Sequence, residues 1–298
     1  MDEKLNIPRW EGQAAYITPP IMNYVNGPTG MIYNPGTALG EQWANHFFIA
    51  EFRGNPANSP LHAFTLKPKG ASFEMEDTKE IVNGVLPTGL DWGPDGALYF
   101  ADWIDGWGVK NEGRIWKLDV PNALKHPLRA QTKTLIQSDF SKKEATELGE
   151  LLQYADMRIR KKAQFQLVKL GEMGYQTLLA AANQKEQQLA RIHGLWGIGQ
   201  LARKEAKYSE AFAPFLTDND PEIQAQAAKL IGDIRHQGAG DKLVALLKHP
   251  SLRVQFFAAE ALGRTADEQG IQPIIDMLAA NNDAVSYTHL TLPTICSV

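Results

Sequence analysis

The sequence predicts a multidomain repeat protein in which a partial β-propeller, of about two four-stranded antiparallel blades, precedes an α-solenoid. One observation is a change in composition: the first 130 residues contain six of the seven tryptophans and twelve of the seventeen prolines. The remainder is rich in Ala, Leu, Gln and Lys, which suits helices, whereas short aromatic runs between Pro and Gly turns suit strands. The other two observations are internal repeats, one in each part.

The N-terminal repeat is a unit of four expected strands. Each copy begins with a Thr-Gly strand that ends at a Pro-Gly or Pro-Asp-Gly turn, and its second strand ends in an acid followed by an aromatic residue. The expected strands are 29–36, 47–52, 61–66 and 72–76 in the first unit and 88–96, 98–103, 113–118 and 131–136 in the second. Four antiparallel strands with a turn of this kind are typical of a propeller blade.

Two blades alone leave an aromatic face uncovered, because propellers close with roughly four to eight blades. We therefore expect residues 1–139 to be the C-terminal blades of a propeller whose upstream part is missing from this fragment. The strand-like run 13–17 is expected to be a remnant of the preceding blade.

The C-terminal repeat is a helix start that recurs at steps of 31, 33 and 31 residues. The starts are Asp156, Gln187, Asp220 and Ser251. Asp220 followed by proline is a typical N-cap, and Ser251 can cap in the same way. Partner helices are expected near 242–247 and 272–278, which gives about four helix pairs over residues 140–283.

Small residues in the two best-aligned helices indicate close helix packing. The residues are Ala227, Ala228, Ala258 and Ala259. Gly232 and Gly263 suit C-terminal caps of the same helices. The pattern resembles HEAT repeats, although their usual period is nearer 40.

The last segment, 284–298, is expected to be foreign to the protein, because its sequence is similar to the translation of a sequencing adaptor and lacks helical periodicity. The alternative is a degenerate terminal cap of the solenoid. The lone cysteine, Cys296, falls within this tail and excludes an internal disulfide, a CxxC pair and a CxxCH haem motif from the stretch.

Composition excludes several classes of function. The net charge of −4 is spread over interspersed acids and bases, so no basic face or tail predicts nucleic-acid binding. No apolar run approaches the roughly 20 residues of a membrane helix, and the N-terminus does not resemble a signal peptide.

Four segments followed by helical repeats carry a family resemblance; they are 27–31, 46–54, 66–70 and 93–103. Over about residues 13 to 280 the chain resembles large bacterial membrane-bound-dehydrogenase-type proteins, whose propeller is similar to soluble quinoprotein glucose dehydrogenase. The resemblance implies a periplasmic or cell-envelope protein with a signal peptide and most of the propeller upstream. A c-type haem domain, absent from this fragment, is implied downstream.

The chemistry implied by the resemblance is oxidation of a sugar or alcohol by pyrroloquinoline quinone with calcium, a His general base and electron transfer to haem. Arg53 matches a cofactor-binding cation of that pattern, and an ion pair with Glu51 is the alternative. Tyr16 and Thr18 match pocket contacts of the quinone, with a buried strand edge as the alternative. Leu86 and Thr88 stand where the pattern carries cofactor-binding arginines.

No metal site and no catalytic residue is assigned. Four acids, Asp91, Asp95, Asp102 and Asp105, fit no calcium loop and are expected at turns and strand ends. The catalytic histidine is unassigned: His46 and His62 are expected at the surface, and His193 is expected to pack on a helix.

Two functions compete at this point. The first is a quinone-dependent sugar or alcohol dehydrogenase-like parent protein; the second is a non-catalytic scaffold whose propeller binds carbohydrate and whose solenoid binds a protein partner. A glycosidase or metal hydrolase has little support, since paired carboxylates and a His-rich ligand set are missing from the sequence pattern.

Overall fold

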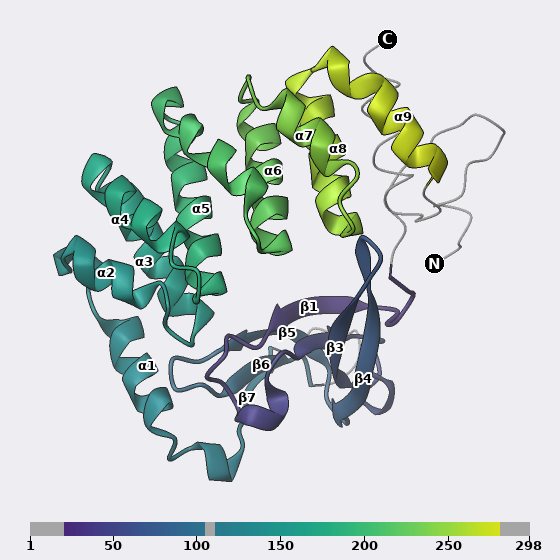
Figure 1. Ribbon diagram of the computed structural model, residues 1–298. Helices are drawn as coiled ribbons and strands as arrows, with labels where there is room; N and C mark the ends of the chain where they lie inside the picture. The colour runs from purple at the N-terminus through teal and green to yellow at the C-terminus, as the bar shows by residue number, and fades with distance from the viewer. Residues whose placement is uncertain (1–20, 105–110, 281–298) are drawn as a thin grey trace.

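The computed structural model describes residues 21–104 and 111–280, with the strands ahead of the helices along the chain (Figure 1). Within these residues the strands form two antiparallel sheets, ordered β1-β2-β3-β4 and β5-β6-β7. Their bounds are Pro28–Tyr33 (β1), Phe47–Glu51 (β2), Leu61–Lys69 (β3), Ser72–Val82 (β4), Pro87–Trp92 (β5), Leu98–Asp102 (β6) and Arg114–Leu118 (β7).

The two sheets are copies of one unit, as the sequence repeat predicts. The register of the first strand pair shifts at the same place in both, between residues 28 and 30 of β1 and between 87 and 89 of β5. After the second strand, equivalent backbone hydrogen bonds close each unit: Phe52 N–H to Gly27 O at 2.7 Å and Trp103 N–H to Leu86 O at 2.8 Å.

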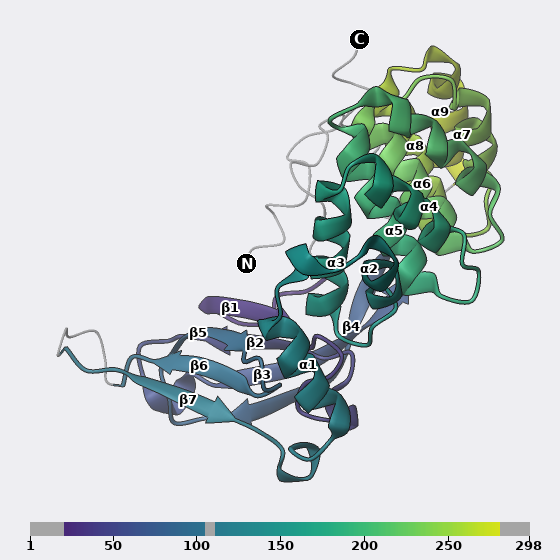
Figure 2. The ribbon, with the colours of Figure 1, turned by 90° about the vertical axis from the view of Figure 1, so that its left-hand side faces the viewer.

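The sheets pack on each other through faces that are not equivalent. The first sheet contributes Phe48 and Ala50 of β2, and the second contributes Leu98 and Phe100 of β6. Aligning the strand ends makes Ile49 the counterpart of Phe100, and Ile49 points to the opposite face of its sheet because side chains alternate along a strand. The two sheets therefore stack head to tail, with β1 beside β5 (Figure 2).

The expected fourth strand of the second unit, 131–136, is wrong. These residues lie in helix α1 (Pro127–Gln137), which begins with proline at its first position and is capped by the His126 side chain. Arg129 fixes the first turn, because its buried guanidinium pairs with Asp119 at 2.7 Å and donates to the Asp95 carbonyl at 2.8 Å. The strand-to-helix change therefore comes before residue 127, rather than near 139.

The helices form two layers. The first helices of successive pairs are α3 (Met157–Lys169), α5 (Gln188–Ala202), α6 (Pro221–Ile234) and α8 (Leu252–Thr265). The second helices are α4 (Glu172–Ala182), the 3₁₀ helix η6 (Ala206–Thr217), α7 (Gly240–Leu246) and α9 (Ile271–Ala280); α1 and α2 (Ala145–Leu151) precede them. All four expected start residues stand at the N-cap positions of the first helices, which confirms the period of 31, 33 and 31 residues. Asp156 and Asp220 cap through their side chains, whereas the expected cap by the Ser251 side chain is not formed.

The core of the helical part is one continuous apolar cluster between the two layers. Fully buried leucines, isoleucines, alanines and one phenylalanine fill it, among them Leu167, Leu178, Leu195, Ile198, Phe212, Ile231 and Ala258. This arrangement, in which each helix pair buries its apolar side against its neighbours, is the one that stabilises solenoids.

The expected C-caps Gly232 and Gly263 are wrong. Helix α6 continues to Ile234 and ends at Arg235, whose left-handed φ is 52°; α8 ends in the same way at Ala266. Gly232 instead permits helix contact, because a Cβ at this position would lie 2.8 Å from Ala261 Cα of α8.

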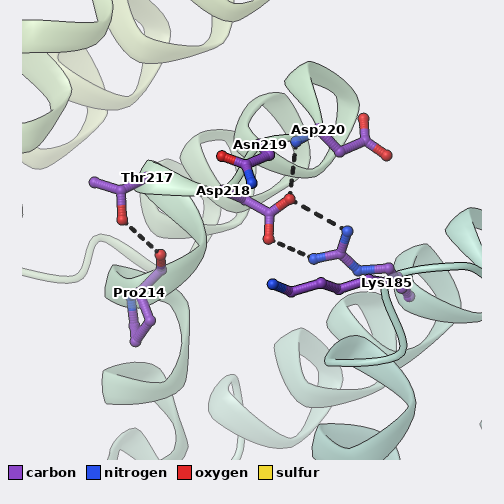
Figure 3. A pocket seen from close by; sticks show the side chains of 7 residues that line it. Lys185, Pro214, Thr217, Asp218, Asn219 and Asp220 are labelled. Carbon is purple, nitrogen blue, oxygen red and sulfur yellow. Dashed lines mark hydrogen bonds and ion pairs between the residues drawn. The ribbon is translucent and has the colours of Figure 1, made fainter.

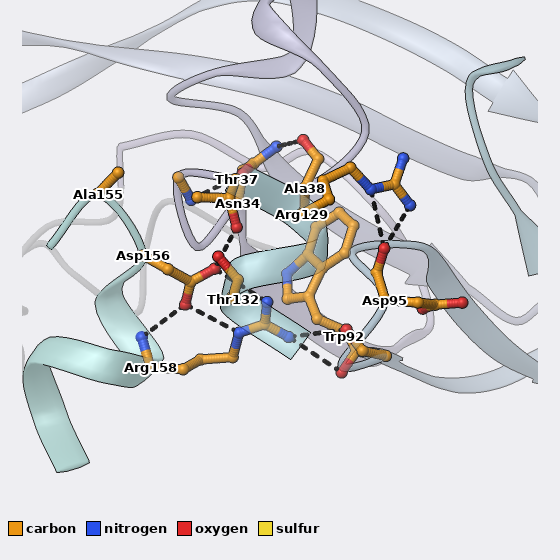
Figure 4. Close-up of polar contacts among 12 residues, drawn as sticks. Asn34, Thr37, Ala38, Trp92, Asp95, Arg129, Thr132, Ala155, Asp156 and Arg158 are labelled. Atoms are coloured by element: carbon orange, nitrogen blue, oxygen red, sulfur yellow. Dashed lines mark hydrogen bonds and ion pairs between the residues drawn. The ribbon is translucent and has the colours of Figure 1, made fainter. Parts of the chain in front are cut away.

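The first repeat is anchored on the loops of both sheets (Figure 4). Asp156, which is fully buried, caps α3 through the Arg158 N–H and accepts the Thr37 hydroxyl at 2.6 Å. Arg158 pairs with the same carboxylate at 2.9 Å and donates to the Gly93 carbonyl at 2.9 Å. The Met157 N–H donates to the Pro35 carbonyl at 2.7 Å, so backbone and side chains together fix α3 on the sheets.

Candidate functional site

Arg53, the described member of the predicted cofactor site, follows strand β2 and is paired with Glu51. Its Nε–H donates to Glu51 Oε1 at 2.7 Å, while 44% of the Arg53 side chain stays exposed. Glu51 also accepts the Asn26 backbone N–H at 2.9 Å, and His62 Nε2 lies 3.1 Å from Oε2. Burial alone would raise the pKa of Glu51, but these three donors outweigh it and hold the pKa below its usual value.

The same arrangement recurs around Asp102 at the end of β6. Asp102 accepts backbone N–H groups from Leu86 and Ile104, each at 2.9 Å, and the Trp116 Nε1–H at 2.8 Å. Trp116 stands opposite Phe100 just as His62 stands opposite Ile49. A buried acid that ties three strands together is therefore part of the repeated unit. Its signal in the sequence was the acid at the end of the second expected strand of each unit.

The ion pair between Arg53 and Glu51, which was the alternative interpretation of Arg53, is present. The cofactor role of Arg53 stays a prediction, and Tyr16 and Thr18 lie outside the described residues. The described surroundings of Arg53 do not fit a quinone that carries carboxylates, because the buried carboxylate of Glu51 already takes one donor of the guanidinium and adds negative charge. Leu86 is fully buried and donates only its backbone N–H to Asp102.

Two of the three histidines differ from expectation, because His46 and His62 were both expected at the surface. His46 is buried rather than at the surface: its Nε2 lies 2.9 Å from Asp77 Oδ2 and its Nδ1 3.0 Å from the Ala44 carbonyl. His62 is partly buried against Glu51. His193 packs inside the solenoid, as expected, with only 4% of its surface exposed.

The acids considered as metal ligands serve the turns and strand ends. Asp95 accepts the Ala97 N–H within the turn, and Asp91 accepts the Trp92 N–H; Asp105 lies outside the described residues. Across residues 21–104 and 111–280, no three His, Cys, Asp or Glu side chains are grouped so that they could hold a metal ion.

A cavity of about 340 Å³ opens between the loops of the second and third repeats (Figure 3). Its central charges are already matched, because the buried Arg191 pairs with Asp218 through Nη2 at 2.5 Å and Nη1 at 3.2 Å. Burial would raise the pKa of Asp218, but Arg191 and the Asp220 N–H outweigh it and lower the pKa. The pair joins the first helix of the second repeat to the loop that leads into the third, and its two charges cancel.

The first helices carry an exposed surface of a different kind, which we name the aromatic–basic face: Lys161, Phe165 and Lys169 of α3, Trp196 of α5, and Arg203 just after α5. Phe165 is 46% exposed and Trp196 40% exposed. Each is the ninth residue of its helix, so the two occupy equivalent positions in neighbouring repeats. Lys161 and Lys169 stand one turn before and after Phe165, on the same side of α3.

The orientation of the Trp196 ring is fixed by contacts with Gln226 of α6 and His193 of α5. Its Nε1–H donates to Gln226 Oε1 at 2.9 Å, and its ring meets the His193 ring edge-on at 5.3 Å. Gln226 in turn donates to Glu222 at 2.7 Å. An exposed aromatic side chain with a fixed orientation loses little conformational entropy when a partner covers it.

Comparison with known families matches this part of the chain: residues 209–288 match the profile of HEAT repeats. The helical region therefore contains HEAT repeats in its C-terminal part, as the periodicity predicted. No curated protein matches the chain. None of the helices in the described part is both long and apolar enough to cross a membrane.

Proposed function

We propose that the protein is a binding scaffold whose helical solenoid holds a protein partner on the aromatic–basic face. The exposure of Phe165 and Trp196 at equivalent positions of neighbouring repeats is the observation that carries the proposal. Large apolar side chains that are exposed at repeated positions of neighbouring helices mark a surface suited to interaction. HEAT repeats use such extended surfaces for protein binding.

The anchoring of α3 supports the same function. Asp156 and Arg158 tie the first repeat to loops of both sheets, so the aromatic–basic face has a fixed orientation relative to the sheets. A rigidly mounted surface binds with a smaller ordering cost than a flexible one.

Photo-crosslinking tests the proposal. Benzoylphenylalanine replaces Phe165 in one sample of the full chain and Met173, which is 62% exposed on α4, in the other. We expect a discrete protein adduct from position 165 whose purified partner then binds the unmodified chain, and no such adduct from position 173. Equal labelling from both positions, or none from either, would reject the scaffold function.

We infer as a second candidate that the sheets are propeller blades of a quinone-dependent sugar or alcohol dehydrogenase-like protein of the cell envelope. Head-to-tail packing favours blades, because a contact between non-equivalent faces can be repeated until a ring closes. The face of the first sheet that carries Phe48 packs on the face of the second sheet that carries Phe100. The first sheet keeps its other face, which carries Ile49, and the second keeps the face opposite Phe100.

The test of this candidate is dye reduction by the intact parent protein with a panel of sugars and alcohols, after addition of pyrroloquinoline quinone and calcium. Turnover that depends on the added quinone supports the candidate. Turnover that is absent across the panel leaves the scaffold function as the better account.

A further inference from the structure

We propose that the partner of the aromatic–basic face is an acidic amphipathic segment of another protein, whose apolar side chains cover Phe165 and Trp196 and whose carboxylates meet Lys161, Lys169 and Arg203. The inference rests on the scaffold function and names the chemistry of its partner. It depends on three features of the face: its charge, its unused cations and its spacing.

The charge of the two helices that form the face has one sign. Helix α3 contains five basic residues and no acid, and α5 contains Arg191 and no acid. Three of these six cations have buried or local partners: Arg158 pairs with Asp156, Arg191 with Asp218, and Arg160 donates to backbone carbonyls of Tyr154 and Ala155.

The remaining cations lie at the surface beside the aromatic side chains. Lys162 reaches the Ile136 carbonyl, whereas no ion pair within the described residues involves Lys161 or Lys169. Arg203 is 58% exposed and makes a long contact of 3.5 Å with Asp233. Within the part of the chain that the structure describes, Lys161 and Lys169 therefore offer positive charge without a paired acid, Arg203 adds a guanidinium that is only loosely paired, and complementary charge selects an acidic partner.

The neighbouring repeats differ, which limits the face to α3 and α5. On α6 and α8 the corresponding surface is neutralised internally, since Glu222 takes both donors of Arg253, and Asp233 takes Lys229 and Arg264. The ninth residues of these two helices are Lys229 and Glu260 instead of aromatic residues. Among these four helices, exposed aromatic side chains and lysines without a paired acid therefore occur together on α3, with Trp196 of α5 beside them in the next repeat.

The spacing on α3 fits a peptide better than a nucleic acid. Cations at one turn on either side of an aromatic residue match a segment in which acids flank an apolar anchor. Nucleic-acid binding depends on neutralising several phosphates in a row, and a chain with a net charge of −4 and three surface cations at this face is poorly suited to that.

Fluorescence anisotropy with defined probes tests the inference on the full chain. The acidic probe is a labelled peptide with Leu and Phe at the i, i+3, i+4 and i+7 positions and Glu elsewhere; the basic probe has Lys in place of each Glu, and the third probe is oligo-dT. Phe165→Ala removes the anchor, and the double variant K161E/K169E reverses the charge. The control M173A/K248E makes one apolar truncation on α4 and one charge reversal just after α7, both at exposed residues.

We expect the acidic probe to bind and the basic probe not to bind. Affinity should fall about tenfold in F165A, as for a central aromatic anchor, and about tenfold in K161E/K169E, as for two lost exposed pairs with reversed charge. The control should stay within about twofold, and circular dichroism should show every variant folded at the assay temperature.

Binding of the basic probe or of oligo-dT as tightly as the acidic probe overturns the inference, as does loss of affinity in the control. If crosslinking at position 165 finds a partner but its binding is unchanged in K161E/K169E, the acidic-segment inference fails while the scaffold function stands. If position 165 finds no partner and the acidic probe does not bind, both fail.

Discussion

His193 makes the stability of the solenoid sensitive to acid. Its Nε2 accepts the Arg160 Nε–H at 3.2 Å, and its Nδ1 lies 2.7 Å from Gln164 Oε1. The imidazole is therefore neutral, with the proton on Nδ1. Burial, together with the positive charges of Arg160 and Lys161, lowers the pKa of His193 from 6.5 to about 4.

The sign of the pH dependence follows from this lowered pKa. Above pH 6.5 the folded and unfolded states both hold a neutral His193, so the group does not affect stability. Below pH 6.5 His193 takes up a proton in the unfolded state but stays neutral in the folded state, so the free energy of unfolding decreases until about pH 4. The full loss corresponds to about 3 kcal/mol, of which about 2 kcal/mol is reached at pH 5.

Urea unfolding followed by tryptophan fluorescence at pH 7 and pH 5 measures the effect. The variant His193→Gln keeps a neutral polar side chain, and we expect its stability loss between the two pH values to be about 2 kcal/mol smaller than that of the unmodified chain. Histidines elsewhere in the chain cancel in this comparison. Glu51 and Asp102, whose pKa values are lowered, lose their stabilising effect only at more acidic pH.

If His193→Gln keeps the full loss between pH 7 and pH 5, the imidazole is not held neutral by its buried site and the reasoning is refuted.

Three substitutions test the fold, each by urea unfolding. Asp102→Ala leaves three donors without their acceptor and should lower the free energy of unfolding by about 4 kcal/mol; a loss below about 1 kcal/mol would contradict its role in tying the strands. Asp156→Ala removes a helix cap and the contact to Thr37, and should cost about 3 kcal/mol and expose α3 to hydrogen exchange. Gly232→Leu places a side chain against Ala261 and should cost about 3 kcal/mol, whereas a neutral effect would show that α6 and α8 are not so close.

Helix starts were predictable because their signals are local. Asp156 and Asp220 each accept a backbone N–H two residues further on, so the capping residue and the helix it begins are adjacent in sequence. The repeated strands were predictable for a similar reason, since alternation and turn residues recur within each unit.

The expectations that failed depend on contacts between distant residues. The run 131–136 contains Thr, Leu and Ile and suits a strand by propensity, but Arg129 binds Asp119 and Asp95 and fixes the segment as a helix. Gly232 suited a C-cap until the packing of α8 gave it another role. His46 is buried beside the rings of Trp43 and Phe48, and its Nε2 meets Asp77 of β4, which lies 31 residues further on.

The site was predictable only in part. The pair of Arg53 and Glu51 could be expected because the two residues are close in sequence. The third partner, His62, depends on the register of β2 and β3, which sequence spacing alone does not fix. The aromatic–basic face was missed although the sequence held its signal, an aromatic residue at the ninth position of two successive repeats.

The anchoring of α3 has a consequence for how the solenoid unfolds. A stack of repeats is held together by neighbour contacts, so each end lacks one neighbour and tends to fray unless something caps it. Here the loops of the sheets, through Thr37, Gly93 and Pro35, join α2 in covering the first end. The repeat next to this cap carries Phe165 of the aromatic–basic face, and it should therefore open less readily than a repeat held by neighbour contacts alone.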